Sequence, residues 1–272
     1  MYVWVVLALV GLVNAGLYPS GGAVKDVDAR AFRSVVIESE RPSVVEFYAP
    51  WCGHCQRLKP EFMKAAKSAQ GMVDFVAVNC DEDANKALCQ RYKVQGFPTI
   101  KTFRPPPPDS KGGDKKKKQP RPEIEDYVGE RKASAIVEHA FSKMRNYASV
   151  VTSRNVDKYL VQNEGSHKVV LLAGKKKKAG MPPLYKALSV DFPHAKFGYV
   201  PASEVPSVAQ KFNVDIPSDP SVPTLLLLFP ETKEPLVYEG ELKRDPIAKF
   251  LNKHLPKNKP AKETARKPKD EL

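Results

Sequence analysis

Two cysteines three residues apart are the residues with the clearest chemical potential in this chain. They lie in the segment Tyr-Ala-Pro-Trp-Cys-Gly-His-Cys (48–55), directly after the apolar run 44–48. If a helix begins here, Cys52 and Cys55 share one face of it and can close a short, reversible disulfide. The unsatisfied N–H groups and the dipole at a helix N-terminus favour the thiolate over the thiol. Because the thiolate is the species that attacks disulfides, the segment predicts a redox centre.

A structural disulfide and a zinc site are the two other interpretations of this pair. Zinc needs further ligands, and the remaining cysteines, Cys80 and Cys89, lack the spacing of a zinc knuckle. We favour redox chemistry because Trp51 precedes and Pro98 follows the pair, and we expect neither a metal nor an organic cofactor. Cys80 and Cys89 are separated by a turn and one predicted helix. They either form a structural disulfide worth roughly 2–3 kcal/mol or stay free thiols.

Both ends of the chain carry predicted targeting signals. The last four residues are an address for retrieval to the endoplasmic reticulum: Lys269, Asp270, Glu271 and Leu272. Residues 1–15 contain an apolar run too short to span a bilayer and end in small residues, as is typical of a cleaved signal peptide. We therefore expect a soluble protein of the endoplasmic reticulum lumen, without stable membrane insertion.

The charge of the chain indicates solvated loops better than it indicates nucleic-acid binding. The chain of 272 residues has a net charge of +13, and much of the excess lies in the lysine runs 115–118 and 175–178 and in the tail after Pro256. No aromatic residues interleave with these lysines, unlike a surface on which bases stack. We expect no nucleic-acid partner; attraction to acidic clients or anionic luminal partners is the alternative.

Two motifs and the C-terminal tetrapeptide together resemble the protein disulfide isomerase family of the thioredoxin superfamily. The motifs are Trp-Cys-Gly-His-Cys (51–55) and Gly-Phe-Pro-Thr (96–99), and the strong match runs from about Val24 to Met144, under half of the chain. With one such motif and a lysine-rich, proline-rich loop, the chain is most similar to the small fungal-type members that have a single active domain.

The cysteine motif has a candidate role for each of its residues. Cys52 lies nearest the predicted helix start and is the candidate nucleophile, while Cys55 would be the shielded resolving thiol. Between them, Gly53 completes the motif and His54 adds a polar, partly cationic group that stabilises the Cys52 thiolate. This favours the dithiol and raises the reduction potential toward about −180 mV, the value for protein disulfide isomerase, from about −270 mV for thioredoxin.

Trp51, Phe97 and Pro98 are the candidate substrate-binding residues. The resemblance implies a cis Phe97–Pro98 bond that faces the cysteines, where a substrate backbone can pair like an added strand. A trans proline in a turn before a strand is the alternative.

Two charged residues are further candidates. Glu46 lies in the otherwise apolar run 44–48; burial would raise its pKa and let it exchange protons with Cys55, whereas on a half-exposed strand it would simply face water. Family members often pair this acid with a lysine of the neighbouring strand, where Ala77 stands here. Arg131 resembles the family arginine that swings toward the resolving cysteine and lowers its pKa; a surface arginine is the alternative.

The pattern of residues 24–145 predicts a thioredoxin-like catalytic domain. The expected order is β-α-β-α-β-α-β-β-α, with Pro60 kinking the helix that follows the cysteines. Residues 104–122 contain four consecutive prolines and four consecutive lysines and predict a hairpin insertion. After an initial strand and turn (24–33), the expected elements are 31–40, 44–48, the cysteine-bearing helix to about 70, 73–78, 85–92, 99–104, 124–128 and 133–144.

Residues 150–256 weakly repeat this order. Ser-Val-Pro-Thr (221–224) echoes 96–99, and Gly-Lys-Lys-Lys (174–177) stands where the first half has its cysteines. The predicted strands are 168–173, 196–200, 225–229 and 235–239, and the predicted helices are 156–162, 183–189, 205–212 and 245–254. The fold class is therefore α/β, with two thioredoxin-like domains, each a mixed central sheet flanked by helices, the first redox-active and the second inactive. Residues 257–272 predict a disordered tail.

The resulting hypothesis is a protein disulfide isomerase that forms, reduces and rearranges disulfides in folding secretory proteins. The alternative is a client-binding chaperone or escort of the endoplasmic reticulum with little redox turnover. The expected partners are unfolded or misoxidised secretory proteins, an upstream thiol oxidase or glutathione, and the KDEL receptor.

Overall fold

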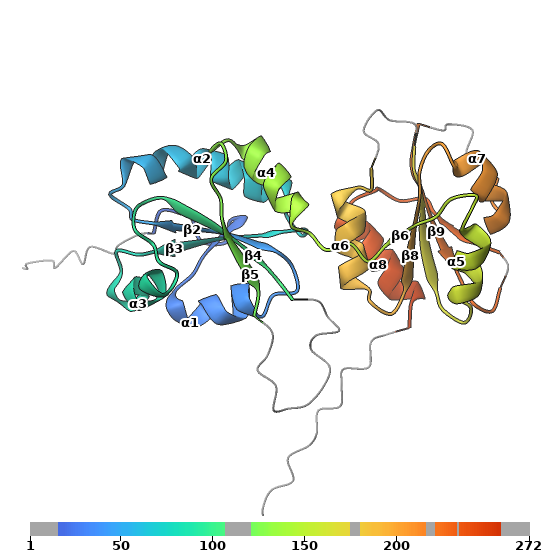
Figure 1. Cartoon of the computed structure of the whole chain (residues 1–272), viewed down its shortest axis with the longest axis horizontal. Coiled ribbons are helices and arrows are strands. Elements are labelled where there is room, and N and C mark those ends of the chain that lie inside the picture. Colours follow the sequence, from blue (N-terminus) through green and yellow to red (C-terminus); the bar gives the residue numbers. More distant parts are fainter. Residues whose placement is uncertain (1–15, 107–120, 175–179, 216–220, 233, 257–272) are drawn as a thin grey trace, which may run out of the picture. The chain divides into compact units, whose positions relative to one another are not determined.

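The computed structural model describes residues 16–106, 121–174, 180–215, 221–232 and 234–256. The chain forms two compact units, the first ending at Met144 and the second beginning at Arg145 (Figure 1). The predicted signal peptide (1–15), most of the predicted insertion (107–120), the second lysine run (175–179) and the predicted tail (257–272) lie outside the described residues.

Unit 1 has a five-stranded mixed sheet in the order β1-β3-β2-β4-β5. β1 and β2 both pair in parallel with β3, while β4 is antiparallel to both β2 and β5. Helices α2 and α4 cover one face of the sheet, and α1 and α3 cover the other (Figure 1). The elements are β1 (Val24–Asp26), α1 (Ala29–Phe32), β2 (Ser43–Tyr48), α2 (Gly53–Ser68), β3 (Asp74–Asn79), α3 (Asp83–Arg91), β4 (Thr99–Arg104), β5 (Glu123–Asp126) and α4 (Ala133–Ser142).

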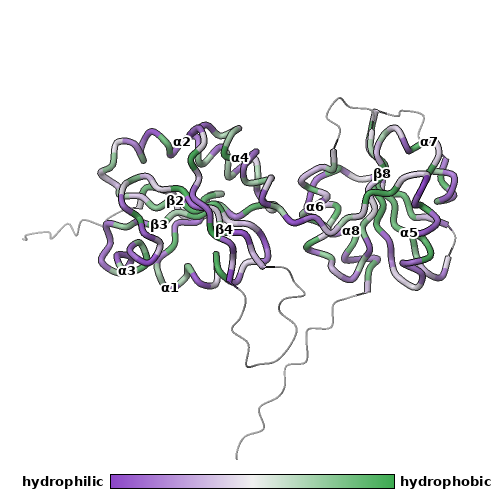
Figure 2. Tube along the Cα trace, viewed as in Figure 1, coloured by the Kyte–Doolittle hydropathy of each residue, from purple (hydrophilic) through white to green (hydrophobic). Residues whose placement is uncertain are grey.

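The alternation of β2 determines which of its side chains face the cysteines. Every residue of β2 is buried, and Val45 and Phe47 pack into the cluster that contains Phe32 of α1. Because successive side chains of a strand point to opposite faces, Glu46 and Tyr48 point to the face covered by α2. Figure 2 shows the corresponding pattern, with hydrophobic residues concentrated along the central strands.

The first helix of unit 1 differs from its predicted bounds, whereas the helix that follows the cysteines runs through Pro60 as expected. The helix expected over 31–40 begins earlier, because the Asp28 carboxylate accepts hydrogen bonds from the backbone N–H groups of Arg30 and Ala31 and caps it. It then widens into one π-helical turn (Arg33–Ile37), where three consecutive β-branched residues disfavour the α-helix. The helix α2 continues through Pro60 to Ser68.

Unit 2 has the same topology, which establishes two thioredoxin-like folds in the chain. Its sheet has the order β10-β9-β7-β8-β6, with β6 and β7 parallel to β8, and β9 antiparallel to β7 and β10. The elements are β6 (Ser149–Val150), α5 (Val156–Gln162), β7 (Lys168–Leu172), α6 (Pro183–Asp191), β8 (Lys196–Val200), α7 (Val205–Val208) with a following 3₁₀ turn (Ala209–Phe212), β9 (Thr224–Leu228), β10 (Leu236–Tyr238) and α8 (Arg244–His254).

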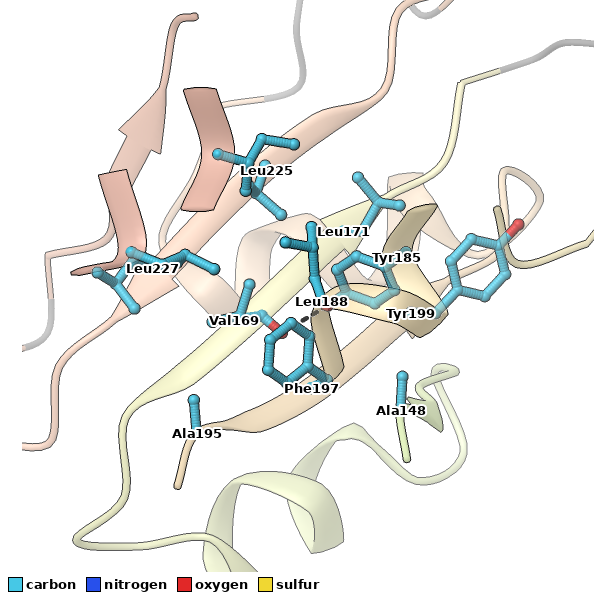
Figure 3. Packing of buried hydrophobic residues seen from close by; sticks show 12 residues of the cluster. Ala148, Val169, Leu171, Tyr185, Leu188, Ala195, Phe197, Tyr199, Leu225 and Leu227 are labelled. Carbon is cyan, nitrogen blue, oxygen red and sulfur yellow. Dashed lines mark hydrogen bonds between the residues drawn. The ribbon is translucent and has the colours of Figure 1, made fainter. Parts of the chain in front are cut away.

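The core of unit 2 lies on both faces of β7. Val169 and Leu171 pack with Tyr185 and Leu188 of α6 (Figure 3), and the alternate residues of β7 pack with α5 and α7 on the other face. The buried Tyr185 hydroxyl lies 2.7 Å from the carbonyl oxygen of Val169, which satisfies its hydrogen-bonding need. Within the described residues, none of the helices combines the length and the apolar character needed to cross a bilayer.

Candidate active site

The two cysteines lie at the start of α2, directly after the turn that follows β2. Cys52 is the N-cap residue of α2, and its sulfur accepts a hydrogen bond from the backbone N–H of Cys55, with 3.2 Å between N and Sγ. Both residues are free thiols; Cys52 is 7% exposed and Cys55 is 0% exposed. Cys52 therefore lies at the positive end of the helix dipole with a backbone donor on its sulfur, whereas Cys55 is shielded from solvent.

Cys55 needs a base before it can react. Burial, the hydrogen bond with Cys52 and the nearby Glu46 carboxyl together raise the pKa of the Cys55 thiol to about 12. At neutral pH Cys55 is therefore a thiol, and a nearby group must take its proton before its sulfur can attack.

Glu46 is a buried acid whose charge acts on the Cys55 thiol, which makes it the candidate for this base. In the sheet it lies between Ala77 of β3 and Ile100 of β4, and it is 0% exposed. Burial raises the pKa of Glu46 to about 7, against the opposing effects of a hydrogen bond from Tyr18 and the charge of Arg131. A carboxyl with this pKa both accepts and returns protons near neutral pH.

Tyr18 is a contact of the site that sequence reasoning missed. Its hydroxyl donates a hydrogen bond to Oε2 of Glu46. The segment that carries it is fixed by Tyr48, whose hydroxyl accepts from the backbone N–H of Leu17 at 2.9 Å and donates to Asp26 at 2.6 Å. No residue pattern in this segment, which precedes the first predicted strand, indicates the contact.

The loop that carries Pro98 lies beside the start of α2. The Phe97–Pro98 peptide bond is cis, and the Phe97 ring stands edge-on to the Trp51 ring, with 6.0 Å between their centroids. Trp51 is 67% exposed, so this pair offers an accessible aromatic surface next to the cysteines.

Arg131 interacts with this loop. Its Nη2 atom donates to the carbonyl oxygen of Pro98 at 3.3 Å, and its charge lowers the pKa of Glu46. In this structure Arg131 therefore interacts with Pro98 and Glu46, and its expected movement toward Cys55 stays a prediction.

His54, between the two cysteines, contacts Arg57. Its Nδ1 atom lies 3.0 Å from Nη2 of Arg57. A guanidinium has donors only, so Nδ1 is the acceptor of this contact. The Arg57 guanidinium also lies next to Gly53 and adds positive charge there.

Cys80 and Cys89 are joined in a disulfide with 6.0 Å between their Cα atoms. It links the end of β3 to α3 and belongs to the cluster that also contains Phe47. These two sulfurs are consequently not available as zinc ligands. The parts of the chain that the structure describes contain no group of three or more His, Cys, Asp or Glu side chains that could hold a metal ion.

The corresponding place in unit 2 has no thiol, since all four cysteines of the chain lie between residues 52 and 89. β7 is followed there by Gly174, where an added Cβ would come within 2.3 Å of the carbonyl oxygen of Ser221. Only glycine fits this close approach of Gly174 to Ser221, which belongs to the segment that echoes the Pro98 loop.

Comparisons with known proteins agree with this fold. The family model for thioredoxin matches residues 23–140. Protein disulfide-isomerase MPD1 of Saccharomyces cerevisiae is 35% identical over 177 residues, 64% of this chain and 55% of its own length. Protein disulfide isomerase-like 2-3 of rice (Oryza sativa subsp. japonica) is 30% identical over 276 residues, 90% of this chain and 57% of its own length. Human protein disulfide-isomerase A6 is 43% identical over 146 residues, 51% of this chain and 30% of its own length.

Among solved structures, a crystal structure of ERdj5 (form II) matches with a TM-score of 0.64 at 18% identity, covering 89% of this chain and 31% of that one. This likeness concerns the fold of both units. The chain spans little more than half the length of the curated relatives that it matches along most of its own length.

A mixed sheet with a Cys-x-x-Cys pair at the start of α2 and a cis-proline loop beside it defines a thioredoxin-superfamily protein. Within that superfamily, the chain is a member of the protein disulfide isomerase family.

Proposed function

We propose that this chain is a protein disulfide isomerase that forms, reduces and rearranges disulfides of folding secretory proteins through Cys52 and Cys55. The observation that carries the proposal is the N-cap position of Cys52, whose sulfur accepts the backbone N–H of a fully buried second thiol. A reactive sulfur backed by a shielded one is the arrangement that thiol–disulfide exchange requires.

In the reductive direction, the Cys52 thiolate attacks a client disulfide and displaces one client sulfur as a thiolate. Cys55 then gives its proton to Glu46, and its sulfur attacks Sγ of Cys52, so that the Cys52–Cys55 disulfide forms and the second client thiolate leaves. The client gains two electrons and the two cysteines lose two. The reverse sequence oxidises a client, and a thiol oxidase or glutathione disulfide then restores the enzyme disulfide.

The aromatic pair of Trp51 and Phe97 and the cis-proline loop support the proposal that clients bind in extended form beside the cysteines. In a chain segment that lies along Phe97, backbone groups can pair as in an added strand. Unfolded and misoxidised proteins expose such segments, so they are the proposed substrates.

Insulin reduction and reactivation of scrambled ribonuclease test this function. Cys52→Ser should abolish both activities, and Cys55→Ser should accumulate mixed disulfides with the client because release is blocked. A variant with both Cys80→Ser and Cys89→Ser is the control, since it removes sulfurs outside the Cys52–Cys55 pair and leaves that pair in place. Full activity of Cys52→Ser would overturn the proposal.

We place this activity in the lumen of the endoplasmic reticulum, on the basis of the predicted signal peptide and the retrieval tetrapeptide of residues 269–272. The KDEL receptor is the proposed partner for retention. Deletion of residues 269–272 should move the protein from cells into the medium, as measured by immunoblotting, while replacement of Lys269 by arginine should not. Equal retention of both variants would contradict the localisation.

A hollow in unit 2 favours a second activity, the holding of unfolded clients. It has a volume of about 560 Å³ and is lined by apolar side chains that include Leu160, Val161 and Phe229, with Lys168 and Lys211 at the same site. Such a surface suits apolar peptide side chains. Suppression of the aggregation of a cysteine-free client should fall in Val161→Asp and stay unchanged in Val237→Asp, a matched change of another exposed valine. An equal effect of both changes would contradict this activity.

A further inference from the structure

The buried carboxyl of Glu46 has unusual neighbours in its own sheet. Strand β2 places it between Ala77 and Ile100, and neither side chain offers a polar group. Among the described residues, Oε1 has no hydrogen-bond partner, while Oε2 accepts the hydroxyl of Tyr18. A carboxyl buried in this way requires at least one strong donor, because a charge without one is expensive in an apolar environment.

The segment that supplies this donor is held firmly. The Tyr18 side chain is 5% exposed, and its ring centroid lies 5.8 Å from that of Tyr48 and 5.9 Å from that of Phe62 of α2. Just before it, Gly16 approaches Asp26 so closely that an added Cβ would lie 2.5 Å from Oδ2 of that residue. Together with the hydrogen bond from the Leu17 N–H to Tyr48, these contacts fix the place of the Tyr18 hydroxyl.

We propose that Tyr18 is a positioning residue for proton exchange between Glu46 and Cys55, and that it provides the polar contact that the neighbouring strand does not provide at Ala77. This inference rests on the proposed function, because it concerns the step in which Cys55 displaces a client from Cys52. Oε2 of Glu46 already accepts the Tyr18 hydroxyl. In this proposal the other carboxyl oxygen, Oε1, which has no hydrogen-bond partner among the described residues, takes the proton of the Cys55 thiol.

Tyr18 can act only as a donor in this contact. Burial raises its pKa far above the usual value for tyrosine, and the neighbouring Glu46 raises it further. It therefore keeps its proton and does not compete with Glu46 as a base. Its hydrogen bond stabilises the charged carboxylate and lowers the pKa of Glu46.

Other titratable and charged groups around Glu46 also affect the protonation of this site. From β1, Asp26 raises the pKa of Glu46, and Arg131, between β5 and α4, lowers it. From α2, Cys55 interacts with both Glu46 and Tyr18. Since none of these groups changes when the Tyr18 hydroxyl alone is removed, a Tyr18→Phe variant isolates the hydrogen bond.

The test measures the titration of Glu46 in the reduced full-length protein without a client, by infrared or NMR signals of the carboxyl group. Tyr18→Phe should raise the midpoint by about one pH unit, the shift expected for loss of one hydrogen bond to a charged group. Tyr92→Phe is the matched control, because Tyr92 is also a partly buried ring of unit 1 but packs with Phe32 and Phe103 on the other face of the sheet. It should leave the midpoint in place.

The second readout is the rate at which Cys55 resolves a preformed mixed disulfide on Cys52, measured in single turnover across pH. In Tyr18→Phe the profile should move to higher pH by the same amount, which slows resolution about fivefold near pH 7. Alkylation of Cys52 should be unchanged. In a Glu46→Gln background, Tyr18→Phe should have no further effect on the profile, which separates the proton step from any general loss of structure.

An unmoved Glu46 midpoint in Tyr18→Phe, or an equal shift in Tyr92→Phe, would overturn the inference. The failure of the proposed function has a different signature. A wild-type protein without insulin reduction would refute that function, whereas the shift of the Glu46 midpoint by Tyr18→Phe would still establish the hydrogen bond that positions this carboxyl.

Discussion

Glu46 combines two demands that oppose each other. The site needs a carboxyl near neutral pKa beside Cys55, and the sheet offers a position between Ala77 and Ile100 that is fully buried. The ionised form is penalised by burial, and this penalty is what raises the pKa of Glu46 to about 7. The same penalty must therefore reduce the stability of the fold.

The pH dependence of stability follows from this shift. Below about pH 4.5 the carboxyl is protonated in both the folded and the unfolded chain. Between about pH 4.5 and about pH 7 the unfolded chain loses the proton and the folded chain keeps it, so the free energy of unfolding falls as the pH rises. The complete loss, reached above about pH 7, is at most about 3 kcal/mol.

Glu46→Gln should remove this decline. Denaturant unfolding of the reduced protein should give equal stabilities for variant and wild type near pH 4 and a variant that is more stable by about 1–3 kcal/mol near pH 8. Glu138→Gln, a change of an exposed carboxyl on α4, is the control and should stay close to wild type at both pH values. A wild type that gains stability across this interval relative to Glu46→Gln would contradict the raised pKa.

At the scale of single residues, the sequence predicted those contacts that join residues close together in the chain. Cys52 and Cys55 lie one turn apart at the start of one helix, so their spacing alone predicts that their sulfur atoms lie close together. The contact between Tyr18 and Glu46 joins residues 28 positions apart, and no spacing rule covers such a pair.

The disulfide between β3 and α3 is a link between elements. It closes a short loop, since Cys80 and Cys89 are nine positions apart. It lies in the core cluster that also contains Phe32 and Phe47. A cross-link of this size lowers the entropy of the unfolded chain, and in the loop-closure model it contributes about 2–3 kcal/mol.

Replacement of Cys80 and Cys89 by alanine together should therefore lower the free energy of unfolding of unit 1 by about 2–3 kcal/mol. The measurement is denaturant unfolding followed by the tryptophan fluorescence of unit 1. Wild type with an intact Cys80–Cys89 bond but with Cys52 and Cys55 alkylated is the matched control. Unchanged stability after loss of both sulfurs would show that the link does not restrain the unfolded chain.

Secondary structure was predictable where the hydrophobic pattern is long and was missed where it is short. The strand at 196–200 has the predicted bounds, and the order of elements in both units agrees with a thioredoxin fold. The two-residue strand β6 was missed because Ser149 and Val150 are too few to show alternation. The helix predicted over 205–212 contains an α-helical turn followed by a 3₁₀ turn, a division that periodicity alone does not reveal.

At the scale of the whole molecule, two sheets of the same topology carry different chemistry. Unit 1 holds all four cysteines, and unit 2 has its own buried core on both faces of β7. Because each core is built from residues of its own unit, damage to one core should not reach the reactive sulfur in the other.

Leu188→Ala tests this separation in the full-length chain. Leu188 is 0% exposed and lies in the core between α6 and β7, so its truncation should destabilise unit 2 by about 2–5 kcal/mol. Scanning calorimetry should show one of two transitions moving to lower temperature. Below that transition, insulin reduction and Cys52 alkylation should keep their wild-type rates. Val161→Ala, at an exposed position of α5, should leave both transitions in place. If Leu188→Ala lowered both transitions together, the two units would be folding as one cooperative body, and the reactivity of Cys52 would depend on a core that contains no cysteine.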